Sequence, residues 1–491
     1  MENISKKQFA AGTFWKVVEQ FSAKGVSFIV SLIIMRKLGA EEYGLIGLTA
    51  IFTNFSDMLI DAGFTTALIR KEKVDDYDYS SVLLMSMLIA VVLYTGIFIG
   101  SPFFAAYYSK PELKAVLRVI CLMLFIQAFS STRNAYIARN MQFKFLFRCN
   151  FTASIISGIL GIVLAYSGFG VWALVIQQLS QTSISTILLF LKIRWNFKFT
   201  IDFQRIKSLA AFGFGVVGSS FINYLASSVS SLIIGKRFSV TELGYSDKGG
   251  QFPMQLSLYT FGAMSSVLLP TISSYQNDLE RVRQILRRVT RMTAFLITPL
   301  MVGMAVTSRE IILLLLKEQW LPIERIMQCS CLYYLATPFM LINVQLFFAL
   351  GHSFIRVKTE LIRITMVFIS LGMCIILKWD IYDLAFAGAI IAVLAALVTS
   401  YEAWKLIRYN AREMFSDIWK PFLTGGLMGA AVITAGRFLL DGAPTIVSML
   451  VKVAVGVAVY LGLSLVEKSP ELYEILDLLK GFLNRKKKAN E

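Results

Sequence analysis

Long apolar runs, separated by short charged or polar stretches, recur along nearly the whole chain. A helix that crosses a membrane needs about 20 mostly apolar residues, because the hydrocarbon core is about 30 Å thick. The runs therefore predict about fourteen transmembrane helices, near 9–35, 43–69, 80–107, 114–136, 149–167, 169–191, 208–235, 246–273, 291–307, 326–350, 355–377, 383–404, 418–437 and 445–466. No small-residue cleavage site follows the first run, so we interpret it as a retained span rather than a secretory signal.

Composition supports the same class of protein. The 491 residues are 56% hydrophobic and only 16% charged, whereas soluble proteins have roughly a quarter of their residues charged. We therefore expect an all-α integral membrane protein. An even number of spans places both termini on the same side of the membrane.

The net charge of +17 is explained by where the basic residues lie. Alternate loops carry 31 lysine and arginine residues on one side and about 11 on the other. Cytoplasmic loops carry the excess of such residues, so the basic side, with both termini, is predicted to be cytoplasmic. Because no DNA- or RNA-binding motif accompanies this charge, no nucleic-acid partner is expected.

The sequence gives little indication of a metal site or of an enzyme active site. The five cysteines lie in or beside apolar runs, where cysteine serves as a small core residue. His352 has no second histidine with which to form a metal site or a catalytic triad. Predicted outer loops are mostly under about ten residues, which argues against a membrane glycosyltransferase or ligase, since such enzymes usually carry long external loops. We expect no metal, no catalytic residue and no cofactor, with coupling to protons, sodium ions or the membrane potential left open.

Two links between predicted spans share a pattern at an offset of 200 residues. Residues 36–45 read RKLGAEEYGL and residues 236–245 read KRFSVTELGY. Six spans separate the links, so the two halves have the same orientation, as in the parallel repeats of some transporters. The repeat predicts a six-helix bundle in 1–200, a second in 201–410, and two further helices with a basic tail in 411–491.

Polar residues occur at helical spacing inside several predicted spans. They are Lys16, Glu19, Gln20 and Lys24 in the first span, Asn54, Asp57 and Asp61 in the second, Gln177, Ser180 and Gln181 in the sixth, Ser219, Asn223, Ser227 and Ser230 in the seventh, and Lys248, Gln251, Gln255 and Tyr259 in the eighth. Charged groups at membrane depth cost about 2.5–3.5 kcal/mol each, so they face a bundle interior or a water-filled cavity. We favour a hydrated cavity for the first two spans. For the seventh, hydrogen bonding between packed helices explains the residues equally well.

The first two spans are antiparallel and turn near residue 39, so residues at equal depth have numbers that sum to about 78. Lys16 then reaches Asp61, and Lys24 reaches Asp57. A paired buried charge costs far less than a lone one, so we predict that these residues form ion pairs along a cavity.

Several segments carry a resemblance to a known family. They are residues 38–44 (LGAEEYG), 61–64 (DAGF), 69–72 (IRKE), 138–143 (ARNMQF), 221–225 (FINYL), 268–270 (LLP) and 317–320 (KEQW), the last similar to a Gly-x-x-Trp segment with its glycine replaced. In their order and spacing the chain resembles the polysaccharide flippases of the Wzx type, in particular the colanic-acid and teichuronic-acid exporters. These belong to the superfamily that also contains the multidrug-and-toxin exporters.

The resemblance implies a V-shaped fold of two bundles that works by alternating access in the bacterial inner membrane. It implies export of an undecaprenyl-diphosphate-linked oligosaccharide for surface polysaccharide synthesis, with a polymerase and glycosyltransferases as possible partners besides membrane lipids. Cations that would hold the diphosphate carry over to Lys16, Lys24, Arg133 and Lys248. A cation-coupled drug exporter of the same fold is the main alternative, although such exporters usually have twelve spans. A membrane glycosyltransferase or ligase and a scaffold protein are weaker alternatives.

Overall fold

The computed structural model describes residues 15, 22, 25–61, 64, 65, 68, 71, 74–193, 198, 224, 228–439 and 443–477. Regular structure in these residues is helical. The helices are α2 (Ala40–Asp61), α4 (Asp76–Tyr107), α5 (Glu112–Ile120), α6 (Met123–Arg139), α7 (Phe143–Tyr166), α8 (Val171–Lys192), α10 (Val240–Ser274), α11 (Leu279–Val306), α12 (Ser308–Leu315), the 3-10 turn η1 (Glu318–Trp320), α13 (Ile323–Ala349), α14 (Ser353–Ile376), α15 (Ile381–Ile407), α16 (Ala411–Leu439) and α17 (Thr445–Val466). The predicted all-α membrane fold is therefore confirmed.

Eleven helical stretches among the described residues are long and apolar enough to cross a membrane, with α5 and α6 together forming one of them. They correspond to predicted spans two to six and nine to fourteen. In the first predicted span, 9–35, residues Gly25–Met35 form an apolar helix and most of the others fall outside the described residues. Most of the seventh predicted span, 208–235, falls outside them too. The eighth corresponds to α10, which is not among the eleven. The count of fourteen stays a prediction.

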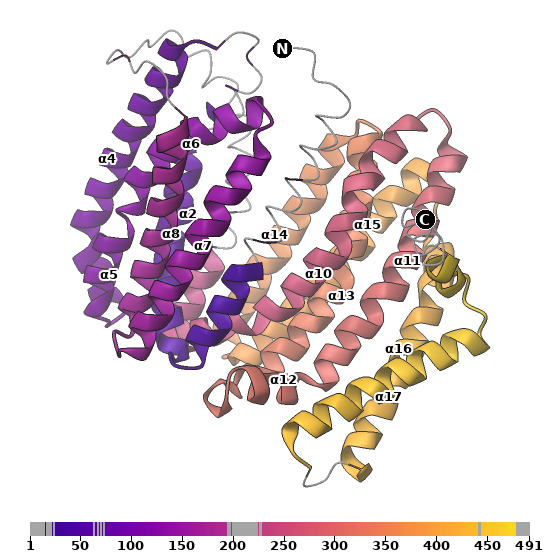
Figure 1. The fold of residues 1–491 in the computed structure, drawn as a ribbon. Helices are drawn as coiled ribbons and strands as arrows, with labels where there is room; N and C mark the ends of the chain where they lie inside the picture. The colour runs from indigo at the N-terminus through magenta and orange to yellow at the C-terminus, as the bar shows by residue number, and fades with distance from the viewer. Residues whose placement is uncertain are drawn as a thin grey trace, which may run out of the picture. The chain divides into compact units, whose positions relative to one another are not determined.

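The chain forms two compact units, residues 1–244 and 245–491. In the first, α2 packs against α4 and α6, while α8 packs against α6 and α7 (Figure 1). Its core contains Leu48, Leu117 and Leu124, all nearly inaccessible to solvent. In the second unit, α13 packs against α11 and α15, and α16 lies between α11 and α17. The predicted domain boundaries at 200 and 410 stay predictions.

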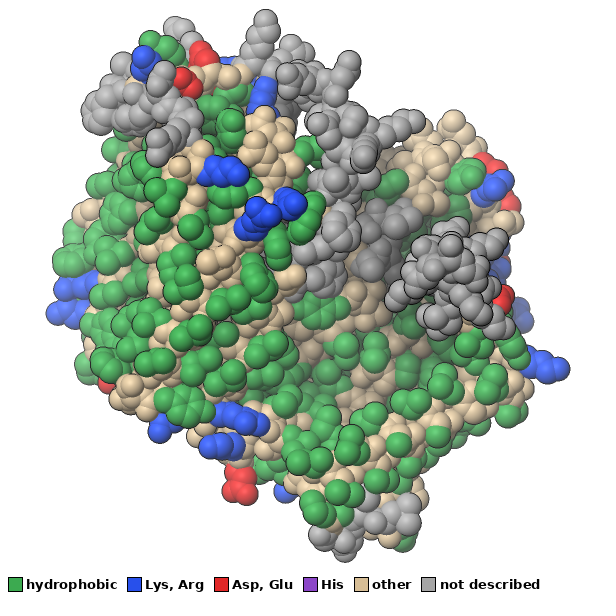
Figure 2. All heavy atoms as spheres, in the orientation of Figure 1, with side chains coloured by type: hydrophobic (Ala, Val, Ile, Leu, Met, Phe, Trp, Pro, Cys, Tyr) green, Lys and Arg blue, Asp and Glu red, His purple; other side chains and the backbone are tan. Residues whose placement is uncertain are grey.

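Large apolar side chains cover the outer faces of the helices. On α4, Val92, Ile99 and Phe103 are 63%, 73% and 69% exposed, and their spacing places them along one side of the helix. Figure 2 shows hydrophobic side chains over most of the visible surface of the helices. A water-facing surface of this kind would be unfavourable, so these faces contact lipid.

Two connections that the sequence predicted as basic loops are largely helical. The segment 281–291 forms part of the first turns of α11, whose N-cap Asp278 accepts a hydrogen bond from the Arg281 amide at 3.0 Å. The segment 405–420 contains only three residues outside α15 and α16. Hydropathy detects where a helix enters lipid, but the hydrogen-bonded backbone continues into water when its side chains are charged. The prediction of loops there was wrong for this reason.

Each of the two links that share the 200-residue pattern leads into a helix that begins in the first unit. The helices after the two links begin at Ala40 and Val240, and these helix starts pack closely. A methyl group on Gly44 would lie 1.8 Å from the Val240 carbonyl oxygen, and one on Gly244 would lie 1.9 Å from the Ala40 carbonyl oxygen. Since 40 and 240, and 44 and 244, are equivalent positions, the contact is reciprocal. Glycine is needed at both positions because the two backbones touch.

The residue that replaces the family's glycine in 317–320 adopts a glycine conformation. Lys317 has φ 77° and ψ 175°, a region that residues with a side chain rarely occupy. The turn η1 follows directly, and in it Trp320 is completely buried and meets the Tyr245 ring edge to face, with 6.0 Å between the ring centroids. The backbone at position 317 therefore has the conformation that the family's glycine would favour, although the residue in this chain is lysine.

Candidate substrate-binding site

Several of the predicted cavity residues are not described at the level of their side chains. Lys16, Glu19, Lys24 and Asn223 lie outside the described residues. Asp61 ends α2, but its side chain lies outside them too. The predicted pairs of Lys16 with Asp61 and of Lys24 with Asp57 therefore stay predictions.

The remaining carboxylate of the second span lies in a polar contact between α2 and α6. Asp57 is half-buried, and its Oδ2 atom accepts a hydrogen bond from Gln127 Nε2 at 2.9 Å. Asn54, nearly one turn earlier on α2, is exposed. Asp57 Oδ1 and Gln127 Oε1 are buried and accept no hydrogen bond from the described residues. Because unmatched acceptors at membrane depth are costly, this contact is suited to receive hydroxyl or ammonium donors, or a proton on the carboxylate.

Gln127 was not predicted. Ser130, Ser131 and Asn134 follow it at helical spacing, so the sequence did carry a signal of a polar face on this span. The significance of Gln127 comes from Asp57, 70 positions away in the chain. Only the packing of α2 on α6 reveals that pair.

Arg133 on α6 is buried, with 4% of its surface exposed. Its Nη1 donates to the Phe129 carbonyl at 2.7 Å, and the guanidinium carbon lies 4.5 Å from the centroid of the Phe190 ring on α8. The backbone carbonyl and the aromatic face both stabilise a cation at membrane depth. The guanidinium is thus held where α6 meets α8.

The glutamines of the sixth span contribute to packing between α7 and α8. Gln181 Nε2 donates to the Ser154 hydroxyl at 3.3 Å, and Ser185 donates to Asn150 Oδ1 at 2.7 Å. Gln177 packs on α7 at Gly161, where a Cβ atom would lie 2.8 Å from Gln177 Cγ. Interhelical hydrogen bonds and small residues are the usual means of joining helices in lipid. These contacts support a packing role for both glutamines.

In the second unit, two predicted residues meet on one helix. Lys248 Nζ donates to Gln251 Oε1 at 3.1 Å, one turn along α10. An ion pair that was not predicted lies on α14, where Arg363 contacts Glu360 at 2.5 Å and 3.1 Å. Both side chains are about four-fifths buried. Glu360 and Arg363 stand three residues apart in the sequence, a spacing that brings two side chains together on one face of a helix.

Sequence comparison relates the chain to known proteins. The polysaccharide biosynthesis protein family matches residues 33–325, more than half of the chain. The chain belongs to this family. Among its relatives, the teichuronic acid biosynthesis protein TuaB of Bacillus subtilis is 22% identical over 86% of this chain and 88% of TuaB. The succinoglycan biosynthesis transport protein ExoT of Rhizobium meliloti is 24% identical over 65% of this chain, and the match spans 64% of ExoT, slightly under two thirds of its length.

Solved structures confirm the fold that the resemblance implied. The lipid II flippase MurJ, in an inward closed conformation, superposes with a TM-score of 0.75 at 17% identity, covering 91% of this chain and 97% of MurJ. An inward-facing multidrug resistance MATE family transporter of the MOP superfamily gives a TM-score of 0.60 at 15% identity, over 80% and 98% of the two chains. The family member described here therefore has the MATE-like fold shared by these transporters.

Proposed function

We propose that this protein moves a lipid-linked oligosaccharide from the inner to the outer leaflet of the bacterial cytoplasmic membrane, for assembly of a surface polysaccharide. The observation that carries the proposal is its relation to TuaB over nearly the whole length of both chains. The fold shared with a lipid II flippase over 91% of the chain supports the same substrate class, a sugar carried on a lipid diphosphate.

Polar groups inside the spans suit such a substrate. Sugar hydroxyls are hydrogen-bond donors as well as acceptors, and the Asp57–Gln127 contact offers buried acceptors that lack donors among the described residues. The diphosphate requires cations, for which Lys16, Lys24, Arg133 and Lys248 are the candidates. We propose alternating access without a covalent step or a bound cofactor, driven by protons, sodium ions or the membrane potential. A polymerase and glycosyltransferases would act on the same lipid-linked intermediate.

Basic residues set the proposed orientation. The 31 bases on alternate connections place both termini in the cytoplasm if all fourteen spans form. A reporter fused after residue 491 should behave as cytoplasmic, and one fused near Gly168 as external. An external C-terminus would contradict both the orientation and the even number of spans.

Deletion of the gene tests the substrate class. We expect loss of one surface polysaccharide and accumulation of its lipid-linked unit on the inner leaflet, because synthesis continues while transfer stops. Complementation with the full chain is the control. Unchanged surface glycans together with increased sensitivity to dyes or antibiotics would instead identify a drug exporter of the same fold.

A further inference from the structure

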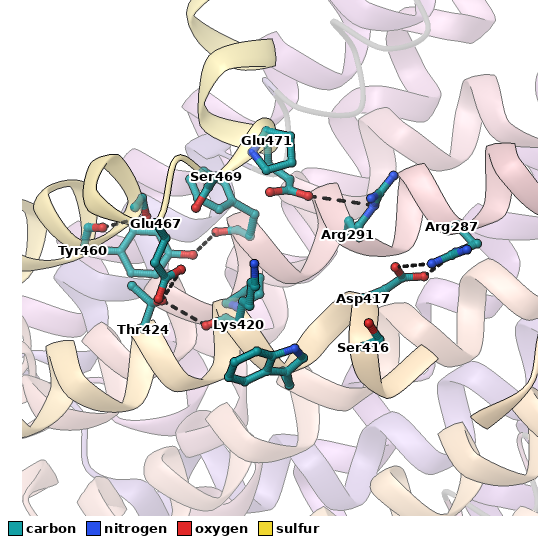
Figure 3. Close-up of a pocket in the computed structure, with 15 residues that line it drawn as sticks. Arg287, Arg291, Ser416, Asp417, Lys420, Thr424, Tyr460, Glu467, Ser469 and Glu471 are labelled. Atoms are coloured by element: carbon teal, nitrogen blue, oxygen red, sulfur yellow. Dashed lines mark hydrogen bonds and ion pairs between the residues drawn. The ribbon is translucent and has the colours of Figure 1, made fainter. Parts of the chain in front are cut away.

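A cavity of about 260 Å³ lies in the second unit where α11, α16 and α17 approach the helical segment 470–477. Figure 3 shows its polar side chains converging from these elements. Thr424 and Ser464 are buried beneath it, at 2% and 1% exposure, while Lys420 and Glu467 are exposed. No residue of this cavity is among the predicted substrate residues.

Helix lengths place the cavity at the depth of lipid headgroups. A hydrocarbon core takes about 20 helical residues, and 20 residues counted back from the far ends of α11 and α16 reach Arg287 and Lys420. The 22 residues of α17 end at Val466, directly before Glu467. All three helices therefore leave the core beside this cavity. Trp419, which lines it and is 40% exposed, is a residue typical of this boundary.

The lining carries equal numbers of positive and negative side chains, namely Arg287, Arg291 and Lys420 with Asp417, Glu467 and Glu471. Two of these pairs are already matched. Arg287 binds Asp417 through two contacts of 2.8 Å and 2.9 Å, and Arg291 lies 3.9 Å from Glu471. The Tyr409 hydroxyl also donates to Asp417 at 2.9 Å, and burial raises the pKa of Tyr409, so it stays protonated.

One base and one acid remain at the cavity. Within the described part of the chain, neither Lys420 nor Glu467 has an oppositely charged group within 4.0 Å. Both oxygens of Glu467 face the Thr424 hydroxyl at 3.4 Å. Figure 3 shows the Lys420 side chain between Glu467 and Arg291. A ligand that satisfies this arrangement carries a negative group for Lys420 and a positive group for Glu467.

An apolar path continues from the cavity toward the membrane core. Leu423 and Leu427 follow Trp419 at intervals of one helical turn on α16 and are 48% and 49% exposed. A ligand with a charged headgroup in the cavity can therefore lay an acyl chain on this stripe. The cavity has the volume of about nine water molecules, which fits a headgroup and is too small for an oligosaccharide.

From these observations we propose that the cavity binds the headgroup of a membrane phospholipid that carries a phosphodiester and a primary amine. Lys420, assisted by the loosely paired Arg291, binds the phosphate, and Glu467 accepts hydrogen bonds from the ammonium group. A trimethylated amine has no N–H donor for Glu467, and a glycerol headgroup has no cation, so both bind more weakly. This inference requires only that the helices span a membrane, and it does not rest on the proposed transport function.

The test uses the full chain, purified and delipidated in detergent, with binding measured by native mass spectrometry and thermal stabilisation. The probes are dihexanoyl phosphatidylethanolamine, phosphatidylcholine and phosphatidylglycerol, with free O-phosphoethanolamine to separate lipid from soluble ligand. We expect the ethanolamine lipid to bind about tenfold more tightly than the other lipids, which is about 1.4 kcal/mol. Free O-phosphoethanolamine should bind more weakly than the lipid, because it lacks the chains that contact α16.

Variants assign the two charges separately. Lys420→Gln should weaken all three phospholipids about tenfold, and Lys420→Arg should retain binding. Glu467→Gln should lower the affinity for the ethanolamine lipid to that of the choline lipid, which should itself be unchanged. Arg412→Gln, on the exposed start of α16, and Asp477→Asn are matched controls that should bind as wild type.

Equal wild-type affinity for ethanolamine and choline lipids would overturn the proposal. So would an unchanged ratio in Glu467→Gln, or equal affinity for the lipid and for free O-phosphoethanolamine. Export of surface polysaccharide by the wild-type chain, measured by complementation, gives an independent result. Selective lipid binding by a wild-type chain that does not export would contradict the proposed function alone, and export by a wild-type chain that does not bind the ethanolamine lipid selectively would contradict this inference alone.

Discussion

The reciprocal contact between the starts of α2 and α10 makes a strong prediction for Gly44→Ala. The new methyl group would lie 1.8 Å from the Val240 carbonyl oxygen. The closest comfortable approach of carbon to a carbonyl oxygen is about 3.3 Å, so the helix starts must separate by roughly 1.5 Å. Overpacking of this kind costs about 1–3 kcal/mol. Alanine recovers up to about 1 kcal/mol through its higher helix propensity, so the net effect is destabilising.

Gly96→Ala is the matched control, because Gly96 lies within α4 and a Cβ there meets nothing within 4 Å. We expect it to be neutral or slightly stabilising. Thermal unfolding of the purified variants, followed by fluorescence-detected size exclusion, compares the two. Gly44→Ala should unfold at a lower temperature than wild type and Gly96→Ala should not.

The symmetry of the contact adds a sharper test. Gly244→Ala should be destabilising in the same way, since its methyl would lie 1.9 Å from the Ala40 carbonyl oxygen. One separation of the helices accommodates both methyl groups, so the double variant should lose less stability than the two single losses combined. If Gly44→Ala is as stable as Gly96→Ala, or if the two losses simply add, the close approach that we describe is wrong.

Three further predictions concern single positions or pairs. Lys317→Gly should raise the thermal unfolding temperature, because relief of the strained backbone contributes about 1–3 kcal/mol, whereas Lys317→Ala, equally strained, should not. Glu310→Gln should destabilise the protein by about 3–5 kcal/mol, because Lys452, which contacts Glu310 at 2.5 Å, would stay buried without its acidic partner. Adding Lys452→Met should restore much of the lost stability. Lys24→Ala and Asp57→Ala should each reduce surface-glycan export at matched protein levels, and additive losses in the double variant would contradict their pairing.

Local sequence pattern was sufficient to predict much of the fold. In lipid every backbone polar group must bond within its own helix, so an apolar run of sufficient length becomes a helix whatever surrounds it. For this reason the predicted run 445–466 matches α17 at both ends, and the run 80–107 matches the end of α4, which begins four residues earlier. The same pattern could not locate the start of α11, because its charged first turns lie outside the lipid, where hydropathy carries no signal.

The candidate site depended more on tertiary structure. Helical spacing singled out Asp57, but its contact with Gln127 and the approach of Gly44 to Val240 join positions that are 70 and 196 residues apart. Spacing alone also could not distinguish a cavity-facing amide from one that joins helices, which is the role that the structure supports for Gln181. The cavity lined by Lys420 and Glu467 is a further feature that the sequence alone could not reveal. Lys420 and Glu467 are ordinary boundary charges in the sequence, and they line one cavity only because α16 enters the lipid at the depth where α17 leaves it.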